Sequence, residues 1–217
     1  IKKNKFLEFK SEFENKNLSN NIIKNIHELL DEEEISHRIV NDLFDGIQSD
    51  LKSEVNINTK KDLLIYSYQV AGTVGLMMAK ILKVKDRESL RCAIDLGVAM
   101  QLTNIARDVI EDKKKNRTYI KADFNSISET IVLSELFYQS AFPAIKNIPI
   151  FSRFAILVAR RIYRRIGYEI LLQKNIESYN NAGKIYVSAS NKMIETFLSF
   201  FDFIKLLFLD STKQKKQ

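Results

Sequence analysis

Glycine and proline are scarce in this chain, with six Gly and two Pro among 217 residues. Sheet-rich proteins need many more turn residues, so this composition favours helices. The single cysteine, Cys92, excludes a disulfide within the chain and fits a reducing compartment. The two histidines, His27 and His37, leave little scope for a zinc site built from histidine.

Long apolar runs are also lacking. No stretch of about 20 uncharged apolar residues occurs, so we expect no transmembrane helix, and residues 1–20 are too polar for a secretory signal. The 14 Phe and 8 Tyr supply a substantial core, which argues against disorder. The net charge of +7 fits an anionic partner: nucleic acid, an anionic membrane or a phosphorylated substrate. Part of this excess lies in the C-terminal "KQKKQ", for which a solvated end is the simpler explanation.

Apolar residues recur at helical spacing in seven segments, near 18–30, 35–51, 62–82, 90–112, 129–146, 150–173 and 190–208. Ser19 is the candidate N-cap of the first segment, and Thr59 or Asp62 of the third. The polar segments 53–62, 113–128 and 180–188 read as connections. Without a series of strands, this pattern predicts one all-α domain over residues 1–217.

The segment "QLTNIARDVIED" (101–112) places four polar side chains on one helical stripe: Gln101, Asn104, Asp108 and Asp112. Glu111 lies beside them. Like charges four residues apart repel by a few tenths of a kcal/mol, so Asp108 and Asp112 do not assist helix formation. A solvated acidic face is one interpretation, and a binding face is the other.

Spacing alone favours the solvated face, but three features weaken that interpretation. The stripe continues backward through Gly97 to Ile94, so it changes from polar to apolar along its length. A glycine in mid-helix costs about 0.5–1 kcal/mol, which indicates a close approach to the backbone at Gly97. Asn104, Asp108 and Asp112 offer only oxygen ligands, which suit Mg²⁺. A substrate with an apolar tail and a diphosphate head would fit such a half-channel.

A second segment, "YSYQVAGTVGLMM" (66–78), is a nearly uncharged helix. Ala71 and Gly75 form a small-x-x-x-small notch, for which tight helix packing is the favoured interpretation. Tyr66 shares a face with Val70, Thr73 and Met77 and needs a hydrogen-bond partner if it is buried. It would orient a diphosphate or a developing cation, or else complete a core contact.

The segments "YSYQVAGTVGLMMAKIL" (66–82) and "LGVAMQLTNIARDVIED" (96–112) closely resemble the signature of the squalene/phytoene synthases. The residues of the second segment resemble the bacterial phytoene synthase branch, since squalene synthases generally have "QKTNIIRDY" where this chain has "QLTNIARDV" (101–109). The resemblance runs from "LFDGIQSDL" (43–51) to "GKIYVSASNKM" (183–193). It implies an all-α isoprenoid (terpenoid) synthase fold, in which helices surround a central apolar cavity.

The resemblance also implies an activity: head-to-head condensation of two geranylgeranyl diphosphates, through prephytoene diphosphate, to phytoene in carotenoid biosynthesis. Mg²⁺, with Mn²⁺ as a substitute, would neutralise the leaving diphosphate, and the apolar wall would exclude water from a carbocation. Phytoene formation needs no NADPH. The implied partner is a prenyl diphosphate and not nucleic acid, and the implied location is the cytoplasm, with peripheral contact to the inner membrane.

Individual roles follow from the resemblance. Asn104, Asp108 and Asp112 would bind the metal, Tyr66, Asp108 and Asp112 would be catalytic, and Glu111 would lie behind the metal ligands. The substrate would be bound by six residues: Gly72, Gly97, Gln101, Arg117, Tyr119 and Tyr163. Without the resemblance, Arg117 within "KKKNR" reads as part of a solvated charge run.

Two departures from the family pattern stand out. Ile120 and Lys121 follow Tyr119 where the family usually has Leu-Pro, a minor change in a loop. More seriously, the first acidic motif, Asp-x-x-x-Asp, is absent, and "DEEE" (31–34) falls where the family has a loop. Asp45 and Asp50 match a helix motif, with structural hydrogen bonding as the alternative. Because the chain starts at Ile1, we expect an N-terminally incomplete domain that lacks its first helices and is inactive alone.

Alternatives therefore remain open. A squalene or presqualene diphosphate synthase belongs to the same class, whereas a non-catalytic assembly factor belongs to another. The absent first motif favours the assembly factor, and the intact "NIARDVIED" opposes it. The Phe-rich and Leu-rich segment 193–210, followed by a basic tail, suits interfacial membrane binding, with a core-packed final helix as the competing interpretation. Prenyl chain length depends on the packing of residues such as Met77, Met78 and Met100.

Overall fold

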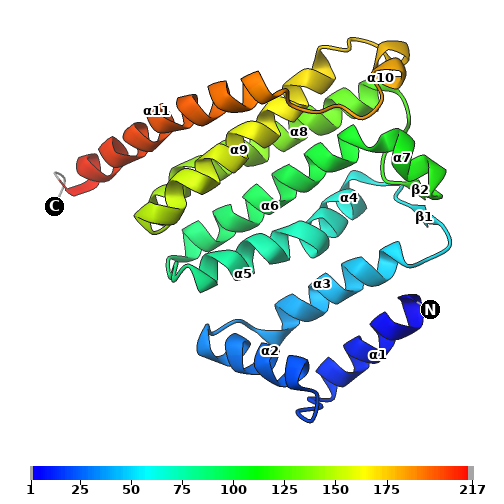
Figure 1. Ribbon diagram of the computed structural model, residues 1–217, viewed down its shortest axis with the longest axis vertical. Helices are drawn as coiled ribbons and strands as arrows, with labels where there is room; N and C mark the ends of the chain where they lie inside the picture. Colours follow the sequence, from blue (N-terminus) through cyan, green and yellow to red (C-terminus); the bar gives the residue numbers. More distant parts are fainter. Residues whose placement is uncertain (1, 215–217) are drawn as a thin grey trace.

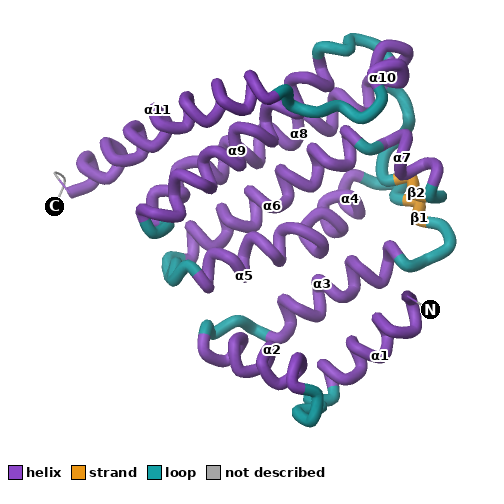
Figure 2. Tube along the Cα trace, in the orientation of Figure 1, coloured by secondary structure: helices purple, strands orange, loops and turns teal. Residues whose placement is uncertain are grey.

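Helices account for nearly all of the computed structural model, which describes residues 2–214 and the side chains of residues 3–208 (Figures 1 and 2). The described elements are α1 (Lys2–Glu14), α2 (Asn21–Glu32), α3 (His37–Asp50), β1 (Val55–Asn56), α4 (Lys60–Ser67), the π-helical η1 (Tyr68–Gly72), α5 (Thr73–Ile81), α6 (Arg87–Arg107), α7 (Val109–Lys114), β2 (Arg117–Thr118), α8 (Phe124–Ala141), the 3₁₀ helix η2 (Phe142–Asn147), α9 (Ile150–Leu171), α10 (Ile176–Ala182) and α11 (Ala189–Gln214). The predicted all-α fold is confirmed.

Helices α1, α2 and α3 lie together at the N-terminal side of the molecule (Figure 1). Their buried side chains form one cluster: Phe13, Ile23, Leu30, Ile35, Val40 and Phe44. Helix α1 is an addition to the predicted helices. Its phenylalanines at 6, 9 and 13 do recur at helical spacing, but the surrounding charged residues outweigh that signal in the sequence.

The helix starts depend on side-chain caps. Thr59 caps α4 as predicted, because its hydroxyl accepts a hydrogen bond from the Asp62 backbone N–H at 3.1 Å. Ser19 was the wrong choice for α2. The cap is Asn20, whose side chain accepts from the Ile22 N–H at 3.0 Å, whereas the Ser19 hydroxyl donates to Asn17.

The third predicted helix, 62–82, is interrupted. Its middle, η1, is a single π-helical segment between α4 and α5, a local widening that is frequent at functional sites. The fourth predicted helix, 90–112, is also divided. Helix α6 ends at Arg107, Asp108 leaves helical geometry with φ −104° and ψ 14°, and α7 follows. Neither interruption contains a proline, so the sequence gives no local sign of it.

The C-terminal half contains α8, α9 and α11, with α9 between the other two in the view of Figure 1. Helix α10 was missed, since residues 176–182 follow a helix stop and were read partly as loop. Two segments predicted as connections pair as short parallel strands, with Val55 opposite Arg117 and Asn56 opposite Thr118. None of the described helices is long and apolar enough to cross a membrane, in agreement with the prediction.

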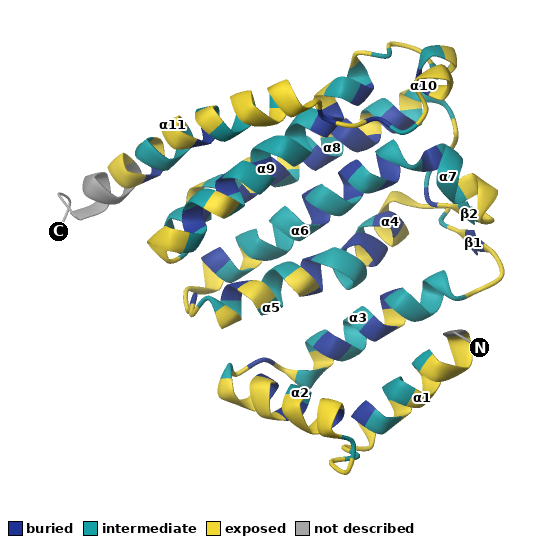
Figure 3. Ribbon diagram, in the orientation of Figure 1, coloured by how far each residue is buried: buried dark blue, intermediate teal, exposed yellow. Residues whose placement is uncertain are grey.

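Helix α6 is the centre of the fold and packs against α5, η1, α8 and α9. Its small and apolar side chains Ala99, Leu102 and Ala106 have no exposed surface. Figure 3 shows the contrast with α11, which carries a largely exposed outer side. The site described next follows one side of α6.

Candidate functional site

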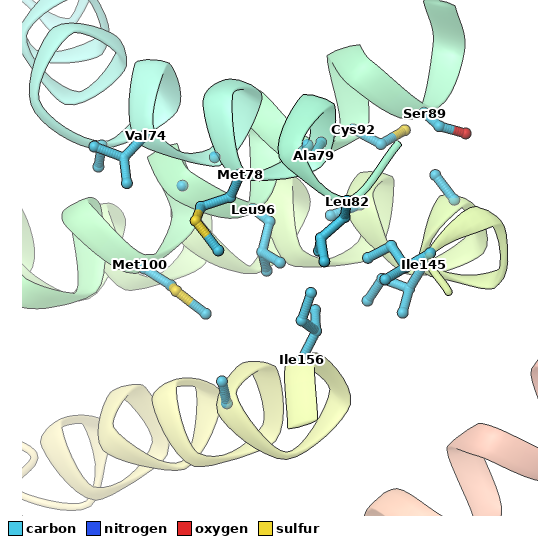
Figure 4. Close-up of a pocket in the computed structure, with 18 of the residues that line it drawn as sticks. Val74, Met78, Ala79, Leu82, Ser89, Cys92, Leu96, Met100, Ile145 and Ile156 are labelled. Atoms are coloured by element: carbon cyan, nitrogen blue, oxygen red, sulfur yellow. The ribbon is translucent and has the colours of Figure 1, made fainter. Parts of the chain in front are cut away.

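A cavity of about 360 Å³ runs beside α6 (Figure 4). Helix α6 contributes one helical face to its wall, with about two residues per turn: Ser89, Cys92, Ala93, Leu96, Gly97, Met100, Gln101 and Asn104. At 1.5 Å per residue, this wall is about 22 Å long. The rest of the wall comes from η1, α5, the turn after α5, the end of α8, η2 and α9. The side chains of Leu82, Ile145 and Ile156 point toward one another in Figure 4.

The cavity has one polar end. Gln101, Asn104 and Tyr163, three of the predicted site residues, line it there, whereas the rest of the wall is mostly aliphatic. The side-chain oxygen Oδ1 of Asn104 is buried and has no hydrogen-bond partner among the described residues. An unpaired buried acceptor costs about 1–3 kcal/mol. Such an oxygen is therefore available to a ligand, either a hydrogen-bond donor or a cation.

The chain bends directly beyond this end, at Asp108. Tyr179 holds the bend from α10: its hydroxyl donates to the backbone oxygens of Ala106 at 2.8 Å and Arg107 at 2.7 Å. The backbone N–H groups of Asp108 and Asp112 still donate to the oxygens four residues earlier, at 2.9 and 2.8 Å. The four-residue spacing of the acidic motif thus continues across the bend.

Asp108 is surrounded by cations. Arg107 donates to both of its carboxylate oxygens, at 2.9 and 2.6 Å, and Lys184 Nζ lies 3.4 Å from Oδ1. Burial favours the protonated acid, yet Arg107 and Lys184 hold the pKa of Asp108 below its usual value. Lys184 also contacts Glu111 at 3.0 Å. Sequence reasoning missed Lys184 and Arg107, although both lie within segments that carry the family resemblance.

Asp112 occupies a different environment. It lines a smaller cavity of about 250 Å³ together with Arg117 and Tyr119, so the structure brings these three predicted residues together. Burial and the nearby charge of Asp108 raise the pKa of Asp112 above its usual value. Arg107 and Lys184 already offset the charge of Asp108, so Asp112 is the carboxylate of this pair whose charge a cation would relieve.

A buried hydrogen-bond cluster adjoins this cavity. The hydroxyl of Tyr66 lies 2.9 Å from Asp50 Oδ2 and 3.1 Å from the Tyr119 hydroxyl, and Tyr119 donates to Asp50 Oδ1 at 2.7 Å. The two rings stack with centroids 4.7 Å apart. Arg117 donates to the backbone oxygen of Asp50 at 2.9 Å. Burial raises the pKa of Tyr66 and of Tyr119, so both phenols stay protonated.

In this cluster Asp50 accepts hydrogen bonds from Tyr66 and Tyr119, as one of the two interpretations of its motif expects. Asp45, its companion in the sequence, instead pairs with Lys10 at 2.8 Å. Tyr66 is absent from the lining of the apolar cavity and faces the cluster. The predicted residues therefore fall into neighbouring groups rather than one continuous wall.

The glycines serve helix packing. A Cβ on Gly97 would lie 2.3 Å from the Ala71 oxygen, and one on Gly75 would lie 2.2 Å from the Ala93 oxygen. The close approach inferred at Gly97 is thus the backbone of a neighbouring helix, although Gly97 also lines the cavity. Gly72 is buried against Ile94, with 3.0 Å left for a Cβ, and neither residue belongs to the cavity lining.

The acidic run 31–34 lies elsewhere. Glu33 pairs with Lys83 at 2.5 Å, beyond the end of α5 and thus near the start of α6, opposite the end that carries Asp108. Among the described side chains, no group of three or more His, Cys, Asp or Glu is placed to hold a metal ion. The predicted ligand set consists of two carboxylates and the amide of Asn104.

The arrangement can be compared with known proteins. A family model described as squalene/phytoene synthase matches residues 6–126, more than half of the chain. This chain belongs to the squalene/phytoene synthase family. The match begins at residue 6, well before residue 43, where the sequence motifs placed the start of the resemblance.

Bacterial phytoene synthases are among the relatives of this family member. The 15-cis-phytoene synthase of Paracoccus sp. is 38% identical over 147 residues, covering 59% of this chain and 48% of the relative. That of Enterobacter agglomerans is 37% identical over 139 residues, covering 54% and 47%. The chain thus spans about half the length of these curated relatives.

A crystal structure of a dehydrosqualene synthase in complex with ligand has the same fold. It is 27% identical, with a TM-score of 0.61, and the match covers 75% of this chain and 63% of that one. The isoprenoid synthase fold predicted from the motifs is confirmed.

Proposed function

We propose that this chain is part of a magnesium-dependent prenyltransferase that condenses two geranylgeranyl diphosphates, through prephytoene diphosphate, to phytoene. One observation carries the proposal: an apolar cavity along α6 ends at a buried, unpaired amide oxygen of Asn104, one helical turn before Asp108 and two turns before Asp112. The apolar wall suits the hydrocarbon tail of a prenyl diphosphate, and the polar end suits its diphosphate head. The bacterial phytoene synthases among the relatives support this assignment.

Asn104, Asp108 and Asp112 fit a hard divalent cation, because all three offer oxygen ligands and no sulfur or imidazole competes. Mg²⁺, or Mn²⁺ in its place, would supply Lewis-acid neutralisation of the departing diphosphate. Arg107 and Lys184 are the chain's own cations at this end and would share the anionic charge.

The remaining predicted residues have supporting roles in the proposal. Gln101 and Tyr163 orient the substrate at the polar end of the cavity. The Asp50–Tyr66–Tyr119 hydrogen bonds fix two protonated phenols, with Arg117 as a further cation for diphosphate. The aliphatic wall excludes water, which protects a carbocation from capture.

A second function, that of a non-catalytic assembly factor, has one observation in its favour. Arg107 and Lys184 pair with Asp108, so this carboxylate of the acidic motif has charge partners within the chain itself. A squalene or presqualene diphosphate synthase is the alternative within the same chemistry. The proposed location is the cytoplasm, with peripheral contact to the inner membrane and no nucleic-acid partner.

Product analysis tests the proposal. Purified chain, and a version extended upstream in its reading frame, are each incubated with geranylgeranyl diphosphate and Mg²⁺ and compared with their Asp108→Ala variants. Phytoene that appears without NADPH and disappears in Asp108→Ala supports prenyl transfer. A reduced condensation product that forms only when NADPH is added would reassign the reaction to the squalene synthase type. Folded protein that gives no prenyl product in either form would favour the assembly factor.

A further inference from the structure

The outward side of α11 is almost entirely apolar. From residue 192 to residue 208, its exposed side chains are Met193, Ile194, Phe197, Phe200, Phe201, Leu207 and Phe208, with two lysines, Lys192 and Lys205. Phe197 and Phe208 are 65% and 68% exposed. Figure 3 shows this exposure along the helix. We refer to these seven apolar residues as the α11 outer face.

The acidic residues of the same helix point inward. Arg161 on α9 lies 3.2 Å from Glu195 and 2.6 Å from Asp202. Ser199 and Leu206 have no exposed surface. An amphipathic surface helix normally turns its charged side to water and its apolar side to the core. Helix α11 keeps its carboxylates against α9 and turns its aromatic side outward.

The phenylalanines of the outer face contact one another. The rings of Phe197 and Phe201 are 5.4 Å apart, edge to face, and those of Phe200 and Phe201 are 6.3 Å apart. Single exposed apolar side chains need no explanation, whereas a contiguous patch marks an interaction surface. The patch is therefore a candidate binding site in its own right.

Charge decides which partner fits. The exposed side chains of residues 192–208 include two lysines and no carboxylate, because Glu195 and Asp202 are paired with Arg161. Residues 209–217 add Asp210 and three lysines, Lys213, Lys215 and Lys216, to the sequence. A helix with large apolar residues on one side, flanked by cations, suits the interface of an anionic bilayer.

We propose that the α11 outer face binds the surface of an anionic lipid bilayer, with the helix lying in the plane of the interface. Phe197, Phe200 and Phe201 enter the acyl boundary, and Lys192 and Lys205 pair with lipid phosphates. Since no described helix can span a membrane, the attachment is peripheral. The inference does not depend on prenyl transfer, because α11 lines neither cavity of the candidate site.

Vesicle flotation tests this surface. The chain is floated with vesicles of phosphatidylcholine and phosphatidylglycerol in a 7:3 ratio (about one-third anionic lipid) and with pure phosphatidylcholine. The test variant is Phe197→Ser/Phe200→Ser/Phe201→Ser. The matched control replaces exposed apolar residues on other helices: Ile22→Ser/Val132→Ser/Leu136→Ser, whose exposed fractions are 62%, 58% and 59%. Circular dichroism verifies that both variants fold.

A second pair of variants isolates charge. Lys192→Glu/Lys205→Glu reverses the two exposed cations, and Lys60→Glu/Lys61→Glu reverses two exposed lysines at the start of α4. We expect the first pair to lower the bound fraction on anionic vesicles and the second to leave it unchanged. Higher salt should reproduce the loss.

The expected result is flotation of the wild-type chain with anionic vesicles, at least a tenfold loss in the triple Phe variant, and retention in the matched control. No flotation of the wild type would overturn the proposal. So would an equal loss in both triple variants. A dimer in light scattering that the Phe variant alone dissociates, without flotation, would assign the face to a second copy of this chain.

Discussion

Helices α6 and α11, of 21 and 26 residues, differ in how their side chains are covered. Helix α6 is covered by α5, η1, α8 and α9, whereas α11 packs mainly against α9 and η2. In α6 almost every side chain meets a neighbour, so each residue type is constrained by a contact. In α11 the inner side is constrained by α9 and η2, whereas most side chains of the outer side are exposed. The comparison teaches that a similar apolar content can serve a core or a surface.

Truncating one large apolar side chain on each helix should give the largest difference in the free energy of unfolding. Leu102→Ala on α6 should lower the free energy of unfolding by about 2–5 kcal/mol, because Leu102 has no exposed surface. Phe200→Ala on α11 should change it by less than about 0.5 kcal/mol, as expected for an exposed position. Urea unfolding of both variants measures the difference. Equal losses would mean that α11 is buried in the folded chain.

The close contact between Gly97 and the Ala71 backbone should have a smaller effect on the free energy of unfolding. Gly97→Ala should cost about 1–3 kcal/mol, since the new Cβ would meet the backbone oxygen of Ala71 at 2.3 Å. Gly167→Ala is the matched control. Its nearest neighbour is the movable side chain of Ile131, at 3.1 Å, and the gain in helix propensity offsets the strain. The two unfolding curves should therefore differ in midpoint, and coincident curves would refute the packing role of Gly97.

The bend at Asp108 depends on one hydroxyl. Tyr179→Phe removes the donor to two backbone oxygens and should cost about 1–2 kcal/mol. Tyr186→Phe should be neutral because Tyr186 is 69% exposed. Hydrogen exchange across residues 104–112 should accelerate in the first variant only. Unchanged exchange there would show that the bend persists without Tyr179.

The smallest effect concerns pH. Arg164 and Gln139 hold the pKa of Glu135 below its usual value, against the effect of burial. The folded pKa is lower than the unfolded one, so Glu135 stabilises the fold above the unfolded pKa of about 4.5. This contribution is lost as the pH falls through the folded pKa. The stability gap between wild type and Glu135→Gln should therefore close on acidification in urea titrations. A constant gap would contradict the assignment.

Periodicity alone located the seven segments that became most of the helices, and the acidic motif placed Asn104 at the end of a cavity. The π-helical segment η1 and the bend at Asp108 could not be predicted, because neither contains a proline, the residue that usually marks a helix interruption in a sequence. The bend is held by Tyr179, more than 70 positions away in sequence. The ion pairs of Lys184 and the hydrogen bonds of Asp50 also join segments that are distant in sequence. A local residue pattern cannot predict such contacts. The outward orientation of the α11 phenylalanines follows from the pairing of Glu195 and Asp202 with Arg161 on α9, a tertiary contact that the sequence of α11 does not reveal.

The most direct test of the account concerns Asn104. Binding of Mg²⁺ together with inorganic pyrophosphate is measured by calorimetry for the wild type, Asn104→Leu and the exposed-site control Asn181→Leu, alongside urea unfolding. The account predicts that Asn104→Leu weakens binding at least tenfold while raising the free energy of unfolding by about 1 kcal/mol, because it removes an unpaired buried oxygen. Binding equal to that of the wild type, or a destabilised Asn104→Leu fold, would contradict it.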